Sequence, residues 1–467
     1  MVFSDLHFIY LFLPIALLIY YLVPFRAKNA VLFLSSMVFY FCGTLDQPLY
    51  MFLLFSAVVV TYLCGRAMRN YPKFKKPIFV FSLVYHFGLL FLFKYADFFF
   101  QNINPLLKGI GLTVELPELL LPIGISFYTF QAVSYLADVY TGTIQESRSF
   151  IDFGTYLSMF PQLIAGPIVQ YKDISCELQK RTIDFASFSD GLKTFVLGMG
   201  LKVILANNLG LLWRDVAETI GFESVTAPLA WLAVIGYSLQ LYFDFYGYSL
   251  MAQGMGRMLG FTIPDNFRHP YISVSMTEFW RRWHITLGTW FRSYVYIPLG
   301  GSRRGNARRV LNLLIVWLFT GLWHGAGWNF LIWGLFLFVV LVIEKAGLLH
   351  FMEKHRVIGH LYMLFLISVS WAIFAVTDME QLKLLFSHLF PFFSSAQPLR
   401  PGDWLDYVRQ YGILLSAGIV LSLPFGRKLY DRYKNSPVCA LVLAAIFGYS
   451  LYWLLKGLNN PFLYFRF

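Results

Sequence analysis

Residues 310–345 read VLNLLIVWLFTGLWHGAGWNFLIWGLFLFVVLVIEK, which is two apolar runs separated by a short turn that contains His324. The windows 309–323 and 328–347 are apolar enough to predict two helices that enter a membrane. His324 lies between them, at or near the depth of the bilayer, where an ionisable side chain is costly and usually has a function. The stretch therefore predicts a helical membrane protein with a reactive group inside it.

The composition of the whole chain favours the same class. Hydrophobic residues make up 58% of the 467 residues, aromatic residues 19% and charged residues only 13%. A water-soluble domain would need more polar side chains to cover its surface. The four cysteines are scattered and show no CxxC spacing, so we predict neither a metal site nor a disulfide framework.

Hydropathy windows divide the chain into clear and equivocal spans. The equivocal segments 118–140, 152–171 and 191–213 carry Gly, Pro, Gln or Asp within apolar sequence, which is typical of broken or re-entrant helices buried in protein. We therefore predict an all-α polytopic membrane protein with an irregular core. The clear spans are 7–25, 29–45, 48–65, 77–95, 226–250, 309–323, 328–347, 359–376, 410–425 and 438–456.

Basic residues gather in alternate loops. Arg26 and Lys28 follow the first span and a basic cluster at 66–76 follows the third, whereas the loops after the second and fourth spans are neutral or acidic. Because basic loops stay on the cytoplasmic side, we predict that the N-terminus and, from the basic segment 427–434, the C-terminus are both extracytoplasmic. The net charge of +12 suits this topology and anionic membrane lipid, not nucleic acid.

A second histidine, His284, lies in the polar segment EFWRRWHITLGTWFR, residues 278–292. If this segment is one helix, Arg281 and His284 share a face and Arg282 points away. A cationic face suits a phosphate-rich donor such as coenzyme A. Anchoring by snorkelling at the cytoplasmic interface is an equal alternative for Arg281 and for Arg292.

His324 has the properties of a general base. An imidazole with an ordinary pKa of about 6.5 stays mostly neutral in a low-dielectric site and accepts a proton from a hydroxyl. Gly325 and Gly327 beside it allow an acyl chain or another backbone to approach closely. The alternative for a membrane histidine is a core side chain that only completes a hydrogen bond, but the pair of histidines with polar neighbours favours catalysis.

The chain resembles the membrane-bound O-acyltransferases, specifically the bacterial branch that includes alginate O-acetyltransferase and the D-alanyl transferase of teichoic acids. The likeness rests on FWRRWHITL at 279–287 followed by WHG at 323–325. It extends to LPIGISFYTFQAVSYLADVY at 121–140, FPQLIAGPIVQY at 160–171 and the run at 241–271 that contains IPDNFRHPY.

The resemblance implies that His324 is the catalytic histidine of the family and that His284 is its second polar position, toward the cytoplasmic entrance. It also implies one membrane-embedded domain over residues 1–467 with a catalytic core at 120–340. In this fold a ring of roughly 11–13 transmembrane and re-entrant helices surrounds a central tunnel. The tunnel connects a cytoplasmic acyl donor with an outward acceptor.

The chain ends NNPFLYFRF, residues 459–467. Taken alone, an aromatic tail is typical of an interfacial belt. The tail also resembles a short C-terminal motif of this branch whose tyrosine accepts the acyl group, which assigns that role to Tyr464 on an extracytoplasmic tail at 458–467. A phenol of pKa about 10 is a poor nucleophile until a base removes its proton, and its ester is then a good acyl donor.

Two further polar residues, Asp244 and Asn329, lie in apolar sequence and are candidates for donor binding or for the lining of the tunnel. Asp244 would orient a histidine or line the tunnel. Pairing with an arginine in a buried network is an equal alternative for this carboxylate.

We therefore predict a multipass O-acyltransferase of the bacterial inner membrane. It takes an acetyl group from a cytoplasmic thioester, acetyl coenzyme A in the first instance, for O-acetylation of an exported polysaccharide such as alginate, another exopolysaccharide or peptidoglycan. No bound cofactor is expected. The expected partner is an extracytoplasmic acetyltransferase resembling an SGNH hydrolase, which collects the acyl group. The alternatives are D-alanyl transfer to teichoic acid and a transporter of polysaccharide or acyl carrier without enzymatic activity.

Overall fold

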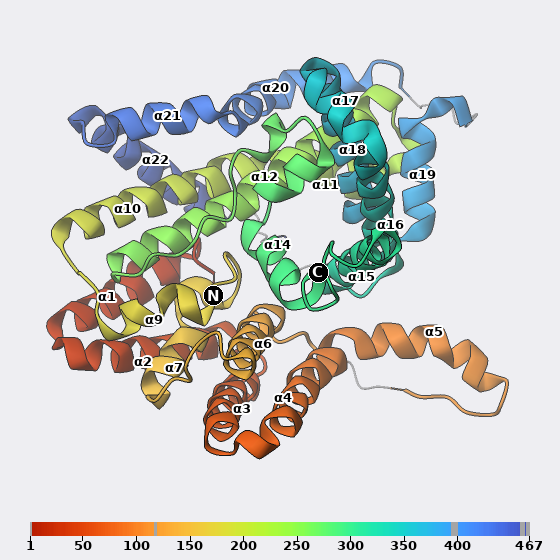
Figure 1. Ribbon diagram of the computed structural model, residues 1–467. Helices are drawn as coiled ribbons and strands as arrows, with labels where there is room; N and C mark the ends of the chain where they lie inside the picture. The colour runs from red at the N-terminus through yellow and green to blue at the C-terminus, as the bar shows by residue number, and fades with distance from the viewer. Residues whose placement is uncertain (1, 116–118, 394–399, 458–462, 464–467) are drawn as a thin grey trace. The chain divides into compact units, whose positions relative to one another are not determined.

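The computed structural model describes residues 2–115, 119–393, 400–457 and 463, and these residues form helices and no β-strand (Figure 1). Among them, six helices are long and apolar enough to cross a membrane. The number is seven if α20 (Asp403–Ser422) and α21 (Pro424–Tyr433), which are bent by 72°, form one span. The predicted all-α polytopic class is confirmed.

Each clear span predicted from hydropathy coincides with a helix. Backbone N–H and C=O groups in lipid must be hydrogen-bonded within the protein, and a single long apolar run satisfies them as a helix. These helices are α1 (Leu13–Leu22), α2 (Phe25–Gly43), α3 (Tyr50–Asn70), α4 (Lys75–Leu90), α12 (Ala227–Met258), α15 (Asn306–His324), α16 (Trp328–Ile343), α18 (Arg356–Ala375), α20 and α22 (Pro437–Leu455). Other helices are α5 (Ala96–Lys108), α9 (Tyr171–Gln179), α17 (Leu349–Lys354) and α19 (Met379–Leu389).

By its internal contacts the chain divides into two compact units, and α10 (Phe185–Gly200) and α12 contribute to both. The first unit comprises residues 1–195 and 251–264. Within it, α3 packs against α4 and α6 (Ile125–Thr141), and α2 packs against α7 (Phe150–Ser158), as Figure 1 shows. Glycines bring helices together here, since a Cβ atom at Gly191 would lie 2.6 Å from the backbone oxygen of Gly254.

The equivocal segments 152–171 and 191–213 differ from each other. Segment 152–171 is broken as predicted, because Met159 leaves helical geometry between α7 and α8 (Phe160–Leu163). Segment 191–213 is not broken, and this prediction was wrong. Helical structure continues from Phe185 to Ile220 and is mostly buried. Its glycines serve close packing on α12, since a Cβ atom at Gly247 would lie 2.6 Å from the oxygen of Gly198.

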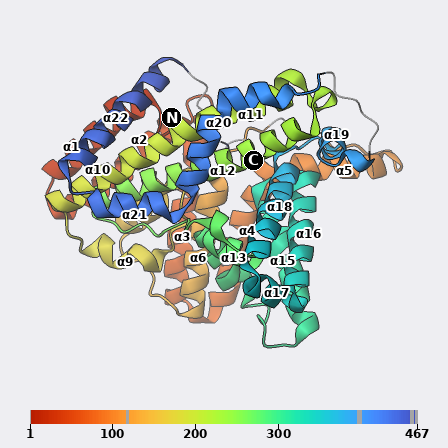
Figure 2. The ribbon, with the colours of Figure 1, turned by 90° about the horizontal axis from the view of Figure 1, so that it is seen from above.

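The second unit comprises residues 196–250 and 265–467. In it α15 and α16 form a helical hairpin, and α18 lies along α16 (Figures 1 and 2). Its core contains the tryptophans Trp317, Trp333 and Trp371, each at least nine-tenths buried. This unit contains both predicted catalytic histidines.

Candidate functional site

His324 is the last residue of α15, at the turn of the α15–α16 hairpin. The turn is made by extended backbone at Gly325 and Gly327, and α16 begins directly afterwards. The His324 side chain is buried, and its ring lies edge-on to Trp333 at 5.2 Å and to Phe374 at 5.3 Å between centroids. The imidazole is therefore enclosed by aromatic rings from α16 and α18.

Close contact between the two helices holds this turn. A Cβ atom at Gly334 of α16 would lie 2.5 Å from the backbone oxygen of Trp317 and 3.6 Å from the Cα atom of Gly321 on α15. Only glycine leaves room for this approach. The turn is also tied to α18, because Asn329 is fully buried and donates through Nδ2 to the backbone oxygen of Phe374 at 3.1 Å.

The segment around His284 is not one helix, so the predicted common face of Arg281 and His284 is wrong. Helix α13 (Met276–Arg282) ends before His284, which adopts φ 44° and ψ 53°, and α14 (Ile285–Phe291) starts after it. The interruption is caused by a distant segment. Trp283 forms an isolated antiparallel bridge with Phe267, and the N–H of Arg268 donates to the oxygen of Arg282 at 2.9 Å.

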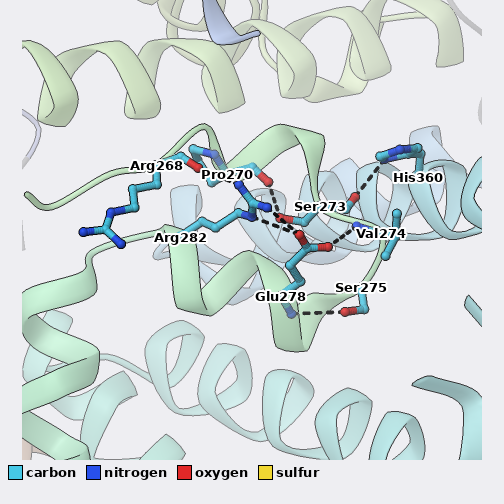
Figure 3. A network of polar contacts seen from close by, with 8 residues as sticks. All are labelled: Arg268, Pro270, Ser273, Val274, Ser275, Glu278, Arg282 and His360. Carbon is cyan, nitrogen blue, oxygen red and sulfur yellow. Dashed lines mark hydrogen bonds and ion pairs between the residues drawn. The ribbon is translucent and has the colours of Figure 1, made fainter. Parts of the chain in front are cut away.

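A polar network supports this arrangement (Figure 3). Arg282, predicted to point away, makes a 2.7 Å ion pair with Glu278 and donates to the oxygen of Arg268 at 3.2 Å. Glu278 accepts from the N–H of Val274 at 2.9 Å, and the Ser275 hydroxyl caps α13 by accepting from the N–H of Glu278 at 3.1 Å. The network fixes the loop before α13 against the helix.

Figure 3 also shows the link from this loop to α18. His360 lies 3.0 Å through Nδ1 from the backbone oxygen of Ser273, whose hydroxyl donates to the oxygen of Pro270 at 2.7 Å. The buried carboxylate of Glu344 adds a second tie, because it accepts from the N–H groups of Met276 at 2.7 Å and Thr277 at 2.8 Å.

His284 itself is buried and packs against Phe245 of α12. Its Nδ1 lies 3.1 Å from the amide oxygen of Asn266, and its ring lies 4.7 Å from that of Phe245 and 5.8 Å from that of Trp323. Burial lowers the pKa of His284 to about 3, so the imidazole is neutral at physiological pH. Trp323 is adjacent in sequence to His324, and its ring centroid lies 5.0 Å from that of His324, so the structure brings both predicted histidines against one indole.

Asp244 has a buried cation as its partner. Its Oδ1 lies 2.7 Å from Nζ of Lys202, and both side chains are almost fully buried. Lys202 also donates to Oδ1 of Asn207 at 2.7 Å. The other carboxylate oxygen, Oδ2, accepts from the backbone N–H of Leu463 at 3.0 Å. The buried network expected as an alternative therefore exists, with a lysine in place of an arginine.

The remaining predicted residues are more dispersed. Arg281 and Arg292 are exposed, which suits either phosphate binding or interfacial anchoring. Tyr464 lies outside the described residues, one position after Leu463. Lys202 and Asn266 were missed by the sequence reasoning. Asn266 could have been found from the sequence, because this residue lies in the IPDNFRHPY run that carries the family resemblance.

Comparison with known proteins now identifies the family. A family model described as "MBOAT, membrane-bound O-acyltransferase family" matches residues 39–377, which include both histidines and their surroundings. This chain belongs to the membrane-bound O-acyltransferase family. It is accordingly a multipass membrane enzyme that transfers acyl groups to oxygen.

Individual relatives extend this likeness to most of the chain. A "Probable alginate O-acetylase AlgI" of Pseudomonas putida is 36% identical and covers 93% of this chain and 89% of the relative. A "Peptidoglycan O-acetyltransferase" of Helicobacter pylori is 32% identical over 82% of this chain. A "Teichoic acid D-alanyltransferase" of Bacillus subtilis is 28% identical and covers only 46% of this chain.

Proposed function

We propose that this O-acyltransferase takes an acetyl group from a cytoplasmic thioester, acetyl coenzyme A, and passes it across the bacterial inner membrane for O-acetylation of an exported polysaccharide. The relatives that cover most of both chains are named for O-acetylation of alginate or peptidoglycan, which supports acetyl transfer to an extracytoplasmic glycan. The D-alanyltransferases match about half of this chain, so D-alanyl transfer is the less supported alternative.

The observation that carries the proposal is the pair of buried histidines that both pack against Trp323. Gly325 and Gly327 form the turn that places His324 at the end of α15, and the ring of His284 lies 5.8 Å from that of Trp323. A neutral imidazole in such a water-poor site accepts a proton from a hydroxyl without the competition of solvent. Transfer of an acyl group to a hydroxyl requires a base that removes the hydroxyl proton.

In the proposed route His324 removes the phenolic proton of Tyr464, and the phenolate oxygen attacks the thioester carbonyl. The carbon–sulfur bond breaks, the proton passes to the departing thiolate, and the acetyl group remains as an ester on Tyr464. The contact between Leu463 and Asp244 supports this route, because it ties the residue before Tyr464 to a buried charge in the same compact unit as His324.

The second half of the route releases the acetyl group on the outer side. An extracytoplasmic SGNH-hydrolase-like partner attacks the tyrosyl ester with its own hydroxyl, which restores the phenol of Tyr464. The partner then transfers the acetyl group to a hydroxyl of the polymer. This arrangement requires the C-terminal tail that carries Tyr464 to be extracytoplasmic.

Labelled acetyl coenzyme A supplied to the purified protein tests the proposal. We expect mass spectrometry to find a labelled acetyl group on the C-terminal peptide, absent from Tyr464→Phe and from His324→Ala. Removal of one general base costs about 100- to 10,000-fold in rate. A well-folded His324→Ala protein that acetylates Tyr464 at the normal rate would exclude the assignment, and a complete absence of adduct from the wild type would favour a transporter.

A further inference from the structure

Asn266 is a polar residue buried to 1% exposure that meets His284 from a segment remote from the WHG motif. Its amide oxygen is the meeting point of three donors. It lies 3.1 Å from Nδ1 of His284, accepts from the hydroxyl of Thr286 at 2.9 Å, and accepts from the backbone N–H of Thr286 at 3.4 Å.

The backbone N–H of Thr286 settles which way the Asn266 amide faces. A peptide N–H only donates, so the atom that receives it is the amide oxygen, and the NH2 group points toward the hydroxyl of Ser249 at 3.5 Å. An amide oxygen only accepts. The contact with His284 is therefore a hydrogen bond donated by Nδ1–H, and in a neutral imidazole Nε2 then carries the lone pair.

Asn266 also holds the main chain around His284 in place. His284 has φ 44°, a left-handed conformation that residues with a β-carbon seldom adopt. The N–H of the next residue, Ile285, donates to the main-chain oxygen of Asn266 at 3.0 Å. The Phe267–Trp283 bridge lies beside this bond. Asn266 thus holds both the ring and the main chain of His284.

We infer that Asn266 is a positioning residue for acyl transfer: it fixes His284 as the Nδ1–H tautomer and makes Nε2 an obligatory acceptor. This inference rests on the proposed participation of His284 in the reaction. In chemical terms, Nε2 of His284 accepts a hydrogen from a thiol or hydroxyl of the reactants. It does not act as a cation toward the phosphates of the donor, a task that is left to exposed residues such as Arg281 and Arg292.

Three variants separate tautomer control from packing. Asn266→Leu keeps the volume and removes the acceptor, and we expect the turnover at saturating donor to fall roughly 10- to 1,000-fold, with KM for the donor little changed. Asn266→Asp restores an oxygen acceptor and should recover most of that loss. Thr286→Val removes the other side-chain donor to the same oxygen and serves as the matched control, with turnover within about threefold of wild type.

A spectroscopic measurement tests the inference independently of activity. In protein labelled with 15N-histidine, the signals lost in His284→Asn identify His284, and we expect a protonated Nδ1 and an unprotonated Nε2. In Asn266→Leu the same pair should show a mixture of tautomers. A protonated Nε2 in the wild type would overturn the inference, as would an unchanged tautomer together with unchanged turnover in Asn266→Leu.

The role of His284 in the reaction and the role of Asn266 in fixing its tautomer are refuted by different results. If His284 has the expected tautomer but His284→Asn transfers acetyl groups normally, the proposed role of His284 in the reaction is wrong. If Asn266→Leu and Asn266→Asp lose activity equally while Thr286→Val does not, Asn266 acts through packing, and tautomer control is refuted.

Discussion

Replacement of Gly334 by alanine should slow catalysis through the contact between α15 and α16. The added Cβ atom would lie 2.5 Å from the backbone oxygen of Trp317, whereas ordinary contact begins at 3.4 Å. Because backbone on α15 cannot rotate away as a side chain can, α15 and α16 must separate locally by about 0.9 Å. His324 lies at the turn of this hairpin and packs on Trp333, the residue before Gly334.

The magnitude follows from the displacement. Overpacking of a close helix contact destabilises by about 1–3 kcal/mol. A misplacement of catalytic groups by about 1 Å costs about 100-fold in rate. We therefore expect Gly334→Ala to fold, to unfold at a lower temperature than the wild type, and to transfer labelled acetyl groups about 100-fold more slowly at saturating donor.

Gly448 provides the matched control. It is also a glycine inside a helix, α22, but a Cβ atom there would meet nothing within 4 Å. Gly448→Ala should leave the rate unchanged and stabilise the protein by about 0.5–1 kcal/mol, because alanine favours the helix. A wild-type rate in Gly334→Ala with a lowered unfolding temperature would refute the idea that the spacing of the hairpin positions His324.

Three further results are expected. Because burial lowers the pKa of His284 to about 3 from about 6.5, the unfolded chain binds a proton that the folded protein does not, so stability should fall as pH drops from about 6.5 toward about 3. Between about pH 7.5 and pH 5 this loss is about 2 kcal/mol, and thermal unfolding of His284→Asn should lack it. Glu344→Ala removes the acceptor of one buried and one partly buried N–H group at the start of α13 and should destabilise by about 2–4 kcal/mol in the same assay, whereas Glu344→Gln should cost less. Arg281→Gln with Arg292→Gln should raise KM for acetyl coenzyme A about tenfold and reduce its dependence on salt, and an unchanged KM with a lower protein yield would show that they are membrane anchors.

The sequence was sufficient for the properties that depend on local composition. Apolar runs such as 328–347 predict helices because the membrane leaves the backbone no other way to satisfy its hydrogen bonds. The WHG motif and the polar segment around His284 were sufficient for the family, and the family model matches the region that contains both. The break between α7 and α8 was also visible, since Pro161 interrupts the apolar run directly after it.

The tertiary structure decided the geometry of the site. Helical spacing placed Arg281 and His284 on one face, but the bridge from Phe267 to Trp283 ends α13 and turns His284 into a left-handed conformation. Lys202 meets Asp244 across two helices, a pairing that no local pattern predicts. The physical reason is the same in each case. A buried polar group must find its partner, and that partner comes from whichever distant segment the fold brings within hydrogen-bond distance, so neither the partner nor the resulting geometry is encoded in the residues next to it.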